Sequence, residues 1–302
     1  MKIGIALGSG AAKGWSHIGI IQALEDIGIH IDVVAGCSIG AYVGAAYCNG
    51  NLNALNEWAS GFTEWQVASL MGVGIHKGGL ISGEKVFQAL QRDFTANTFK
   101  ELEKPFAVVA TDLYSGKEIW FSRGSVVDAV RASSAIPALF PPVWYHKRWL
   151  VDGAVVNPVP VNLCRHLGAD FVIAVNLSAD SRPQRRERNK AEHQANQRKT
   201  NDFFRKSKDM MQQWFGNGEE PGEIQVQQPN APSIIGVMSC SLDILQDRVS
   251  RSRLAGEPPE ILIEPQLRNF GIMEFHRTKE LVEEGKNSVM RVRDQIEYLL
   301  GV

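Results

Sequence analysis

One serine lies between two glycines where a predicted strand meets a predicted helix. The pentapeptide is Gly36-Cys37-Ser38-Ile39-Gly40, with an apolar run at residues 29–35 before it and a helix-like run at residues 41–47 after it. A G-x-S-x-G sequence in this context is typical of a nucleophile elbow, a sharp turn that exposes the serine hydroxyl at the carboxyl edge of a sheet. The pattern alone also occurs in strand-to-helix turns without chemistry. The strand and helix around it favour Ser38 as a nucleophile.

A glycine-rich loop follows the first predicted strand, residues 2–7. Its sequence is Gly8-Ser9-Gly10-Ala11-Ala12-Lys13-Gly14. Small residues before a helix expose backbone amides, and the helix dipole favours negative charge there, so the loop can bind an anion. One candidate is the oxyanion formed when Ser38 attacks an acyl carbon. The other is a dinucleotide pyrophosphate, which would require an acidic residue ending the second strand, whereas Glu25 and Asp26 fall inside a predicted helix.

A serine nucleophile needs a group that accepts its proton. Of the seven histidines, only His276 lies late in the chain, where an α/β-hydrolase has its base, and its place before the last predicted helix also fits a surface or capping residue. Asp152 is the better candidate. It follows a short predicted strand, residues 148–151, and precedes Gly153, whose turn lets the carboxylate approach another loop. An Asp-Gly pair alone is typical of a turn.

Composition limits the class of protein. The chain has 302 residues, 44% of them hydrophobic, which suits one large α/β domain or two small ones. A formal net charge of −1 gives no overall field that attracts nucleic acid, so we expect no nucleic-acid partner. No run reaches the roughly 18 apolar residues of a membrane span, and the N-terminal run is too short for a signal peptide, so we expect a cytoplasmic protein. The cysteines lack metal or disulfide spacing, and we expect buried free thiols and no metal: Cys37, Cys48, Cys164 and Cys240.

Strand and helix patterns alternate through the first 180 residues. Strands are predicted at residues 2–7, 29–35, 106–111, 117–121 and 170–177, and a helix at residues 18–27. From Ser181 to about Pro232, charged and amide residues with Gly and Pro breakers predict a partly disordered insertion. A helix over 234–254, a strand over 260–265 and one closing amphipathic helix over 281–300 follow. These patterns predict an α/β fold with a mainly parallel central sheet flanked by helices.

Together these segments resemble the patatin-like phospholipase family. The glycine-rich loop, the elbow and Asp152-Gly153-Ala154 occur in the family's order, and residues 110–116 and 129–143 are similar to further family blocks. The likeness runs from Lys2 to about Leu177 and is nearest to bacterial RssA-type proteins, which residues 248–265 also resemble. It implies a single patatin-like three-layer domain over residues 1–302, with the insertion at about 181–232 and a helical extension over 234–302.

The resemblance implies a Ser-Asp dyad without histidine, in which Ser38 is the nucleophile and Asp152 the general base and acid. It implies an oxyanion hole at Gly8, Ser9, Gly10 and Ala11, supported by Lys13, Gly14, Gly36, Gly40 and Gly153. The chain departs from the family at Ser9 and Ala11, where glycines are common, and at Lys13, where arginine is usual. The implied activity is hydrolysis of carboxylic esters of phospholipids or related lipids through an acyl-serine intermediate, without a cofactor.

Alternatives to this activity are a catalytically weak regulatory or interaction protein that keeps the fold, and a dinucleotide-binding oxidoreductase. Residues 203–215 mix aromatic, methionine and basic residues, as in a segment that lies on a membrane surface, so a lid or a peripheral contact with the inner face of the membrane is one hypothesis and a helix packed on its own domain is the other. Five apolar residues after the helix that follows Ser38 could line an acyl groove or belong to the core: Trp65, Leu70, Met71, Val73 and Ile75.

Overall fold

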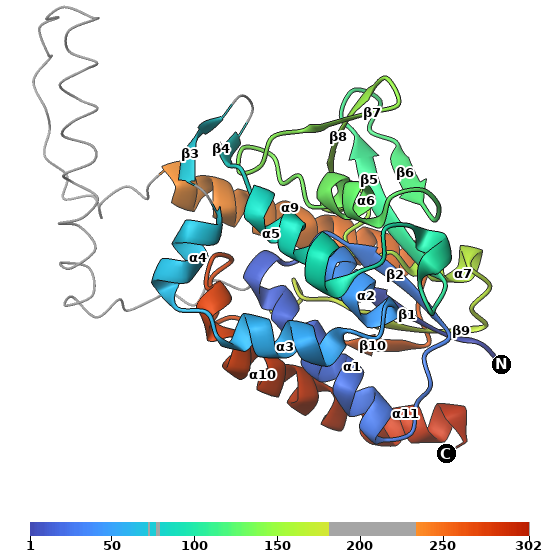
Figure 1. The fold of residues 1–302 in the computed structure, drawn as a ribbon. Coiled ribbons are helices and arrows are strands. Elements are labelled where there is room, and N and C mark those ends of the chain that lie inside the picture. The colour runs from blue at the N-terminus through green and yellow to red at the C-terminus, as the bar shows by residue number, and fades with distance from the viewer. Residues whose placement is uncertain (72, 77–78, 181–233, 302) are drawn as a thin grey trace, which may run out of the picture. The chain divides into compact units, whose positions relative to one another are not determined.

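The computed structural model describes residues 1–71, 73–76, 79–180 and 234–301 (Figure 1). The chain divides into a unit of residues 1–181 and 238–302 and a unit of residues 182–237. The predicted insertion and the segment 203–215 lie outside the described residues, so the lid hypothesis and the assignment of one domain to residues 1–302 stay predictions.

Eight strands form the central sheet, in the order β10-β9-β1-β2-β5-β8-β7 with β6 also paired to β5. The five from β10 to β5 are parallel, and β6, β8 and β7 are antiparallel to their neighbours. The α/β class and the mainly parallel sheet are therefore confirmed. The strands are β1 (Ile3–Leu7), β2 (Val33–Cys37), β5 (Phe106–Asp112), β6 (Glu118–Phe121), β7 (Val143–Tyr145), β8 (Arg148–Asp152), β9 (Phe171–Val175) and β10 (Ile261–Ile263). A separate antiparallel pair consists of β3 (Val73–His76) and β4 (Gly79–Ile81).

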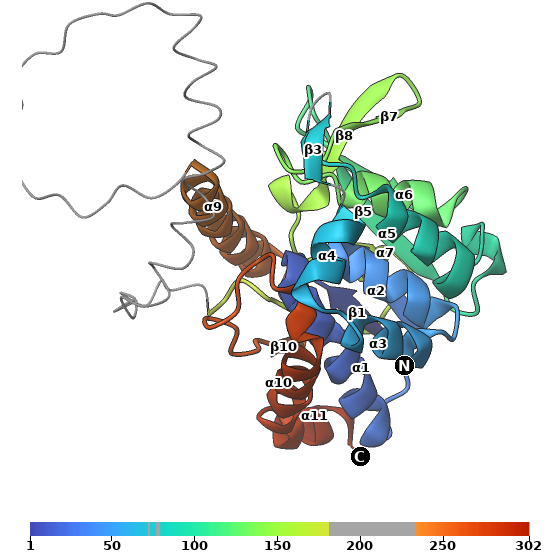
Figure 2. The ribbon, with the colours of Figure 1, turned by 60° about the vertical axis from the view of Figure 1, so that its left-hand side comes forward.

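Alternate side chains of the parallel strands enter two hydrophobic clusters, one on each face of the sheet. In β1, for example, Ile5 and Leu7 belong to the larger cluster and Ala6 to the smaller one. The larger cluster includes α1 (Ser16–Asp26), α2 (Ile39–Cys48), α6 (Val126–Ser133) and α10 (Thr278–Met290), and Figure 2 shows α10 beside α1. The smaller cluster includes α7 (Val161–His166), with Leu254 of α9 (Ile234–Gly256) packed against it. Helices thus cover both faces, which gives the three layers.

The other α-helices of the described residues are α3 (Leu52–Ser60), α4 (Glu64–Met71), α5 (Glu84–Ala89) and α11 (Arg293–Leu300). Within the described residues, no helix is both long and apolar enough to cross a membrane.

Three local predictions are wrong. The strand expected at 29–35 runs instead from Val33 to Cys37, because residues 29–32 form a connection in which Asp32 exchanges hydrogen bonds with Ile3. The single closing helix is two helices, since Val292 leaves helical geometry with φ −117° and ψ 10°. Cys240 is exposed, whereas the other three cysteines are buried as expected.

Candidate active site

Ser38 occupies the tight turn between β2 and α2. Its backbone has φ 56° and ψ −121°, a region that side-chain-bearing residues rarely adopt and that costs on the order of 1–3 kcal/mol. The turn is close to β1: a Cβ atom on Gly40 would lie 2.1 Å from the Leu7 carbonyl oxygen, so only glycine fits there. The Ser38 carbonyl accepts the first bonds of α2, from the amides of Ala41 and Tyr42. Ser38 is therefore the N-cap of α2.

Strand β5 brings Asp152 to this turn. Strand β6 pairs with residues 108–111 of β5. Some of these residues also pair with β2 and others also pair with β8. Because a strand has two edges, β6 lies on one edge of β5, and β2 and β8 share the opposite edge. On that shared edge, Cys37 at the end of β2 is opposite Val109, and Asp152 at the end of β8 is opposite Ala110. The carboxyl ends of β2 and β8 thus meet at adjacent positions of one strand.

The two side chains are in direct contact. The Ser38 hydroxyl donates a hydrogen bond of 2.6 Å to Oδ2 of Asp152, and the Ala154 amide donates one of 2.8 Å to Oδ1. The Thr111 hydroxyl donates to the Asp152 carbonyl at 2.8 Å, which fixes the backbone. Gly153 lets the chain pass against β5, because a Cβ atom there would lie 2.4 Å from the Val109 carbonyl oxygen. Both carboxylate oxygens are consequently held in place.

Burial sets the electrostatics of this pair. Asp152 is 2% exposed, and its burial raises the pKa of its carboxyl group from 3.8 to about 6, against the opposing hydrogen bonds from Ser38, Ala154 and the Cys37 thiol. At neutral pH the carboxyl group is therefore ionised but basic enough to accept a proton from a serine. Burial, with the nearby Asp152 charge, raises the pKa of the Cys37 thiol well above its usual range, so this neighbouring thiol stays protonated.

The glycine-rich loop offers fewer free amides than its sequence suggests. The Gly8 amide donates to the Val175 carbonyl at 3.2 Å, and the Ser9 amide to the Pro158 carbonyl at 2.9 Å. The amides of Gly10 and Ala11 have no hydrogen-bond acceptor within the described part of the chain. Ala11 adopts φ 49° and lines the same hollow as Ser38, so an alanine is accommodated where the family favours glycine.

Two basic residues of the loop region are buried. His17 Nε2 lies 2.7 Å from the Gly8 carbonyl oxygen, and burial lowers the pKa of its imidazole to about 4. A neutral His17 can therefore donate from Nε2 and hold the loop in place. Lys13 is 6% exposed. Burial raises the pKa of Asp243 in α9, and the positive charge of Lys13 acts against this rise.

Sequence reasoning assigned no role to two residues that hold Ser38 and Asp152 in place. The Ser38 amide donates to the Ser133 hydroxyl at 2.8 Å, and the Asp152 amide donates to the Ala135 carbonyl at 2.9 Å. Both partners fall in the block 129–143, so the resemblance marked the segment but nothing in its spacing indicated these contacts.

His276, the alternative base, lies against a different carboxylate. Its Nε2 is 3.7 Å from Oε1 of Glu64, whereas the Ser38 hydroxyl is bonded to Asp152. No cluster of three or more His, Cys, Asp or Glu side chains within the described residues could hold a metal ion.

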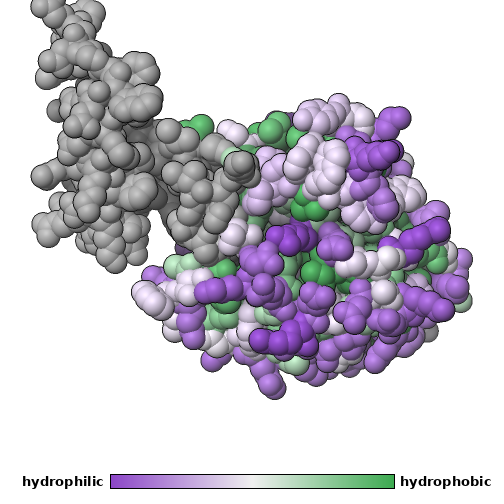
Figure 3. All heavy atoms as spheres, turned by 45° about the horizontal axis from the view of Figure 1, so that its top comes forward, coloured by the Kyte–Doolittle hydropathy of each residue, from purple (hydrophilic) through white to green (hydrophobic). Residues whose placement is uncertain are grey.

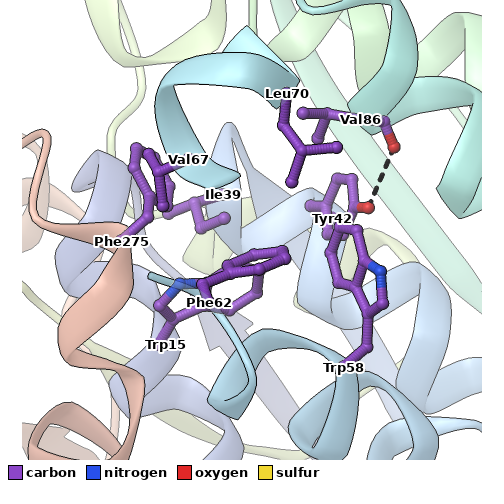
Figure 4. Close-up of a pocket in the computed structure, with 9 residues that line it drawn as sticks. All are labelled: Trp15, Ile39, Tyr42, Trp58, Phe62, Val67, Leu70, Val86 and Phe275. Carbon is purple, nitrogen blue, oxygen red and sulfur yellow. Dashed lines mark hydrogen bonds between the residues drawn. The ribbon is translucent and has the colours of Figure 1, made fainter. Parts of the chain in front are cut away.

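An open, shallow hollow lies over Ser38. Its walls are mainly apolar: Ala11, Ile39, Tyr42, Val86, Phe87, Ser134, Ile136, Phe140 and Phe275. A second hollow shares four of these residues and adds an aromatic and aliphatic lining: Trp15, Trp58, Phe62, Val67 and Leu70 (Figure 4). The Tyr42 hydroxyl donates to the Val86 carbonyl at 3.0 Å and so fixes a shared wall.

The linings of these two hollows can be compared with the residues predicted to form an acyl groove. Leu70 lines the second hollow, but Trp65 is 82% exposed and lines neither. The side chains of Met71, Val73 and Ile75 lie outside the described ones.

Residues 5–165 match the model of the family described as patatin-like phospholipase. The chain belongs to this family. Among its relatives, an uncharacterized NTE family protein of Mycobacterium tuberculosis is 32% identical over 321 residues, which cover 94% of this chain and 89% of that protein. The neuropathy target esterase sws of Drosophila melanogaster is 30% identical over 185 residues, which cover 59% of this chain and 13% of that protein.

The human patatin-like phospholipase domain-containing protein 6 is 30% identical over 184 residues, which cover 59% of this chain and 13% of that protein. The crystal structure of VipD from Legionella pneumophila aligns with 100% of this chain and 80% of its own at 13% identity, with a TM-score of 0.36. The patatin match includes the glycine-rich loop, Ser38 and Asp152 but ends before β9, whereas the mycobacterial alignment extends over most of the C-terminal part. These comparisons do not single out the RssA type.

Proposed function

We propose that this patatin-like protein hydrolyses carboxylic esters of phospholipids or related lipids through an acyl-Ser38 intermediate. The observation that carries the proposal is the 2.6 Å hydrogen bond from the Ser38 hydroxyl to the buried carboxylate of Asp152, beside an apolar hollow. The backbone of Ser38 is strained, as in a nucleophile elbow. The same proposal includes two further points: the protein is of the RssA type, and it is located in the cytoplasm.

In the acylation half-reaction, Ser38 Oγ attacks the ester carbonyl carbon while its proton moves to Oδ2 of Asp152. The new Oγ–C bond gives a tetrahedral intermediate whose former carbonyl oxygen carries the negative charge. As the bond to the leaving alcohol breaks, Asp152 returns the proton to the alcohol oxygen. A raised pKa suits both transfers, because the carboxylate accepts a proton more readily and still releases it near neutral pH.

In deacylation, water attacks the acyl carbon and gives its proton to Asp152, and the C–Oγ bond then breaks as Ser38 recovers that proton. For both intermediates we assign the oxyanion to the amides of Gly10 and Ala11, since those of Gly8 and Ser9 already donate elsewhere. Each such donor is worth on the order of 3 kcal/mol in the transition state. The N-terminus of α2 adds a favourable dipole beside Ser38.

We assign the acyl chain to the two apolar hollows, because their lining is almost wholly apolar. An ester carbonyl at Ser38 leaves its hydrocarbon chain in the first hollow, and the shared wall of Ile39, Tyr42, Val86 and Phe275 leads to the second. Apolar burial of this kind is worth about 0.8 kcal/mol per methylene group. The lining therefore favours a fatty acyl ester over a short polar one.

Two alternatives from the sequence have weaker support. For a dinucleotide, the acidic residue should end the second strand, but β2 ends at Cys37, and Glu25 in α1 accepts a hydrogen bond from Tyr47. A regulatory protein without activity does not require a serine hydroxyl bonded to a basic carboxylate.

Covalent labelling tests the proposal without the natural lipid. The full-length protein is treated with a fluorophosphonate probe, and the adduct is located by mass spectrometry. We expect labelling at Ser38 that is absent in Ser38→Ala and falls at least 100-fold in rate in Asp152→Asn. Ser134→Ala is the matched control, because this serine lines the same hollow and should leave labelling unchanged.

A folded wild-type protein that is not labelled would contradict the dyad and favour the regulatory alternative. An adduct on Ser134 would contradict Ser38 as the nucleophile. If Ser38 is labelled, release of fatty acid from phosphatidylcholine, lysophospholipid and triacylglycerol then identifies the lipid class.

A further inference from the structure

An exposed apolar row crosses the antiparallel end of the sheet. Trp144 of β7 is paired with Trp149 of β8, and their rings lie 5.0 Å apart. The β5–β8 register pairs Asp112 with Leu150, and the Leu113 amide donates to the Trp149 carbonyl at 2.9 Å, so Leu113 continues the row. These three residues, the "aromatic row", are 57%, 36% and 46% exposed in the order Trp144, Trp149, Leu113. Side chains this large rarely stay exposed together without a partner.

The surroundings of the row are aromatic and basic. Tyr114, next to Leu113, is 81% exposed, and Lys117 and Lys147 are exposed on the two turns that flank the row. Figure 3, which brings the β7–β8 end forward, shows apolar and weakly polar residues gathered beside strongly polar ones.

The acidic groups of these segments are already paired. Within residues 112–118 and 143–149 the only acidic residues are Asp112 and Glu118. Asp112 contacts Arg148 at 3.3 Å and Glu118 contacts Arg253 at 2.6 Å. Lys117 and Lys147 have no acidic partner within the described part of the chain. The face thus combines tryptophan and tyrosine with uncompensated positive charge.

This combination matches a lipid surface better than a protein partner. Tryptophan and tyrosine prefer the interface between hydrocarbon and water, and each lysine near an anionic bilayer contributes about 1 kcal/mol of attraction. The row is about 10 Å of strand from the dyad, because Trp149 and Asp152 are three residues apart on β8, and this odd spacing puts their side chains on opposite faces of the sheet.

We propose that the aromatic row, with Tyr114, Lys117 and Lys147, docks this protein on the surface of an anionic phospholipid bilayer. The inference rests on the proposed lipid substrate and adds where the enzyme meets it. A bilayer held at this end of the sheet lies one short strand from the dyad. Docking through residues 203–215 is a separate hypothesis, and the variants below leave that segment unchanged.

Flotation with vesicles tests the docking surface. The full-length Ser38→Ala protein, which leaves the lipid intact, is mixed with vesicles of phosphatidylcholine with or without phosphatidylserine. We expect binding that requires phosphatidylserine and weakens at high salt. In this background, Lys117→Gln with Lys147→Gln should lower the partition constant about 30-fold, from two contributions of about 1 kcal/mol. Leu113→Ser with Trp144→Ser should lower it at least 10-fold.

Tyr298→Ser is the matched control, because this tyrosine is 86% exposed on α11, and it should bind vesicles like the parent protein. Each variant is also made with Ser38 intact and assayed on a water-soluble ester, which reports the fold and the dyad without a bilayer. Equal binding by parent and row variants, or binding without phosphatidylserine, would overturn the docking surface. A row variant that changes a self-association seen in solution, with vesicle binding unchanged, would assign the face to a second copy instead.

The two proposals fail separately. Hydrolysis of the soluble ester without vesicle binding keeps the dyad and rejects docking. Vesicle binding that depends on the row, by a protein whose Ser38 is inert, keeps docking and rejects the hydrolase.

Discussion

Replacing Asp152 by asparagine should abolish activity and stabilise the fold. The carboxyl group is buried, and its charged form lacks the hydration that it has in the unfolded chain, which is why its pKa is raised from 3.8 to about 6. An amide of the same shape has no charge to bury. Its oxygen can accept the Ala154 amide hydrogen, and its NH₂ group can donate to the Ser38 oxygen, so neither contact of the native carboxylate is left empty.

The size of the effect follows from linkage. A rise of about 2 pKa units, at 1.36 kcal/mol each, means that the charged carboxylate costs the folded state about 3 kcal/mol at pH 7. Between pH 4 and 6 the folded state binds more protons than the unfolded state, so the stability of the native protein falls as pH rises through this range and the cost is complete above about pH 6. We therefore expect Asp152→Asn to raise Tm by roughly 3–6 °C at pH 7 and by almost nothing at pH 4.

Thermal unfolding followed by circular dichroism at pH 4, 5, 6 and 7 measures this difference. Ser38→Ala is the control: it is equally inactive, but it removes a hydrogen bond that stabilises the carboxylate, so it should not be stabilised at pH 7. A Tm gain that is the same at every pH, or a loss of stability in Asp152→Asn at pH 7, would refute the assignment of a charged, buried carboxylate beside Ser38.

Three further outcomes depend on the same site. For a water-soluble ester, kcat/KM should rise with pH to a plateau with a midpoint at about 6 and be roughly a tenth of the plateau at pH 5, because Asp152 must be ionised; a midpoint that disappears in His276→Gln would contradict this. His17→Leu removes the donor to the Gly8 carbonyl and should lower kcat about tenfold with little change in KM, with partial recovery in His17→Gln, and steady-state kinetics on the same ester measure both. Trp58→Ala enlarges the second hollow and should shift the best acyl chain of a p-nitrophenyl ester series to greater length, with a gain of about fourfold in kcat/KM for each added methylene that the new space accepts; an unchanged chain-length profile would place the acyl chain elsewhere.

Local patterns in the sequence predicted the strands and the elbow well, because each depends on neighbouring residues. Apolar runs predicted β1, β5, β9 and β10 within a few residues, and two glycines around Ser38 marked a turn that needs room on both sides. The boundary of β2 and the break at Val292 were missed, because hydrogen bonds from residues distant in sequence or a local change of φ decide them.

The pairing of Ser38 with Asp152 came from a different source. The residues alone favoured Asp152 over His276 as the base, and the order of blocks shared with the patatin family implied that it forms a dyad with Ser38. The two residues are 114 positions apart, and this spacing does not predict that Ser38 Oγ lies 2.6 Å from Asp152 Oδ2.

The sequence by itself determined the chemical groups, the turn that strains the serine and the family in which such groups occur together. The tertiary structure decided the rest, because pairing between strands has no local signal. Strand β5 places the ends of β2 and β8 on one of its edges, Val175 and Pro158 take the Gly8 and Ser9 amides, and the β7–β8 pair exposes the aromatic row. Each of these depends on which distant segments share an edge, and only the assembled sheet fixes that.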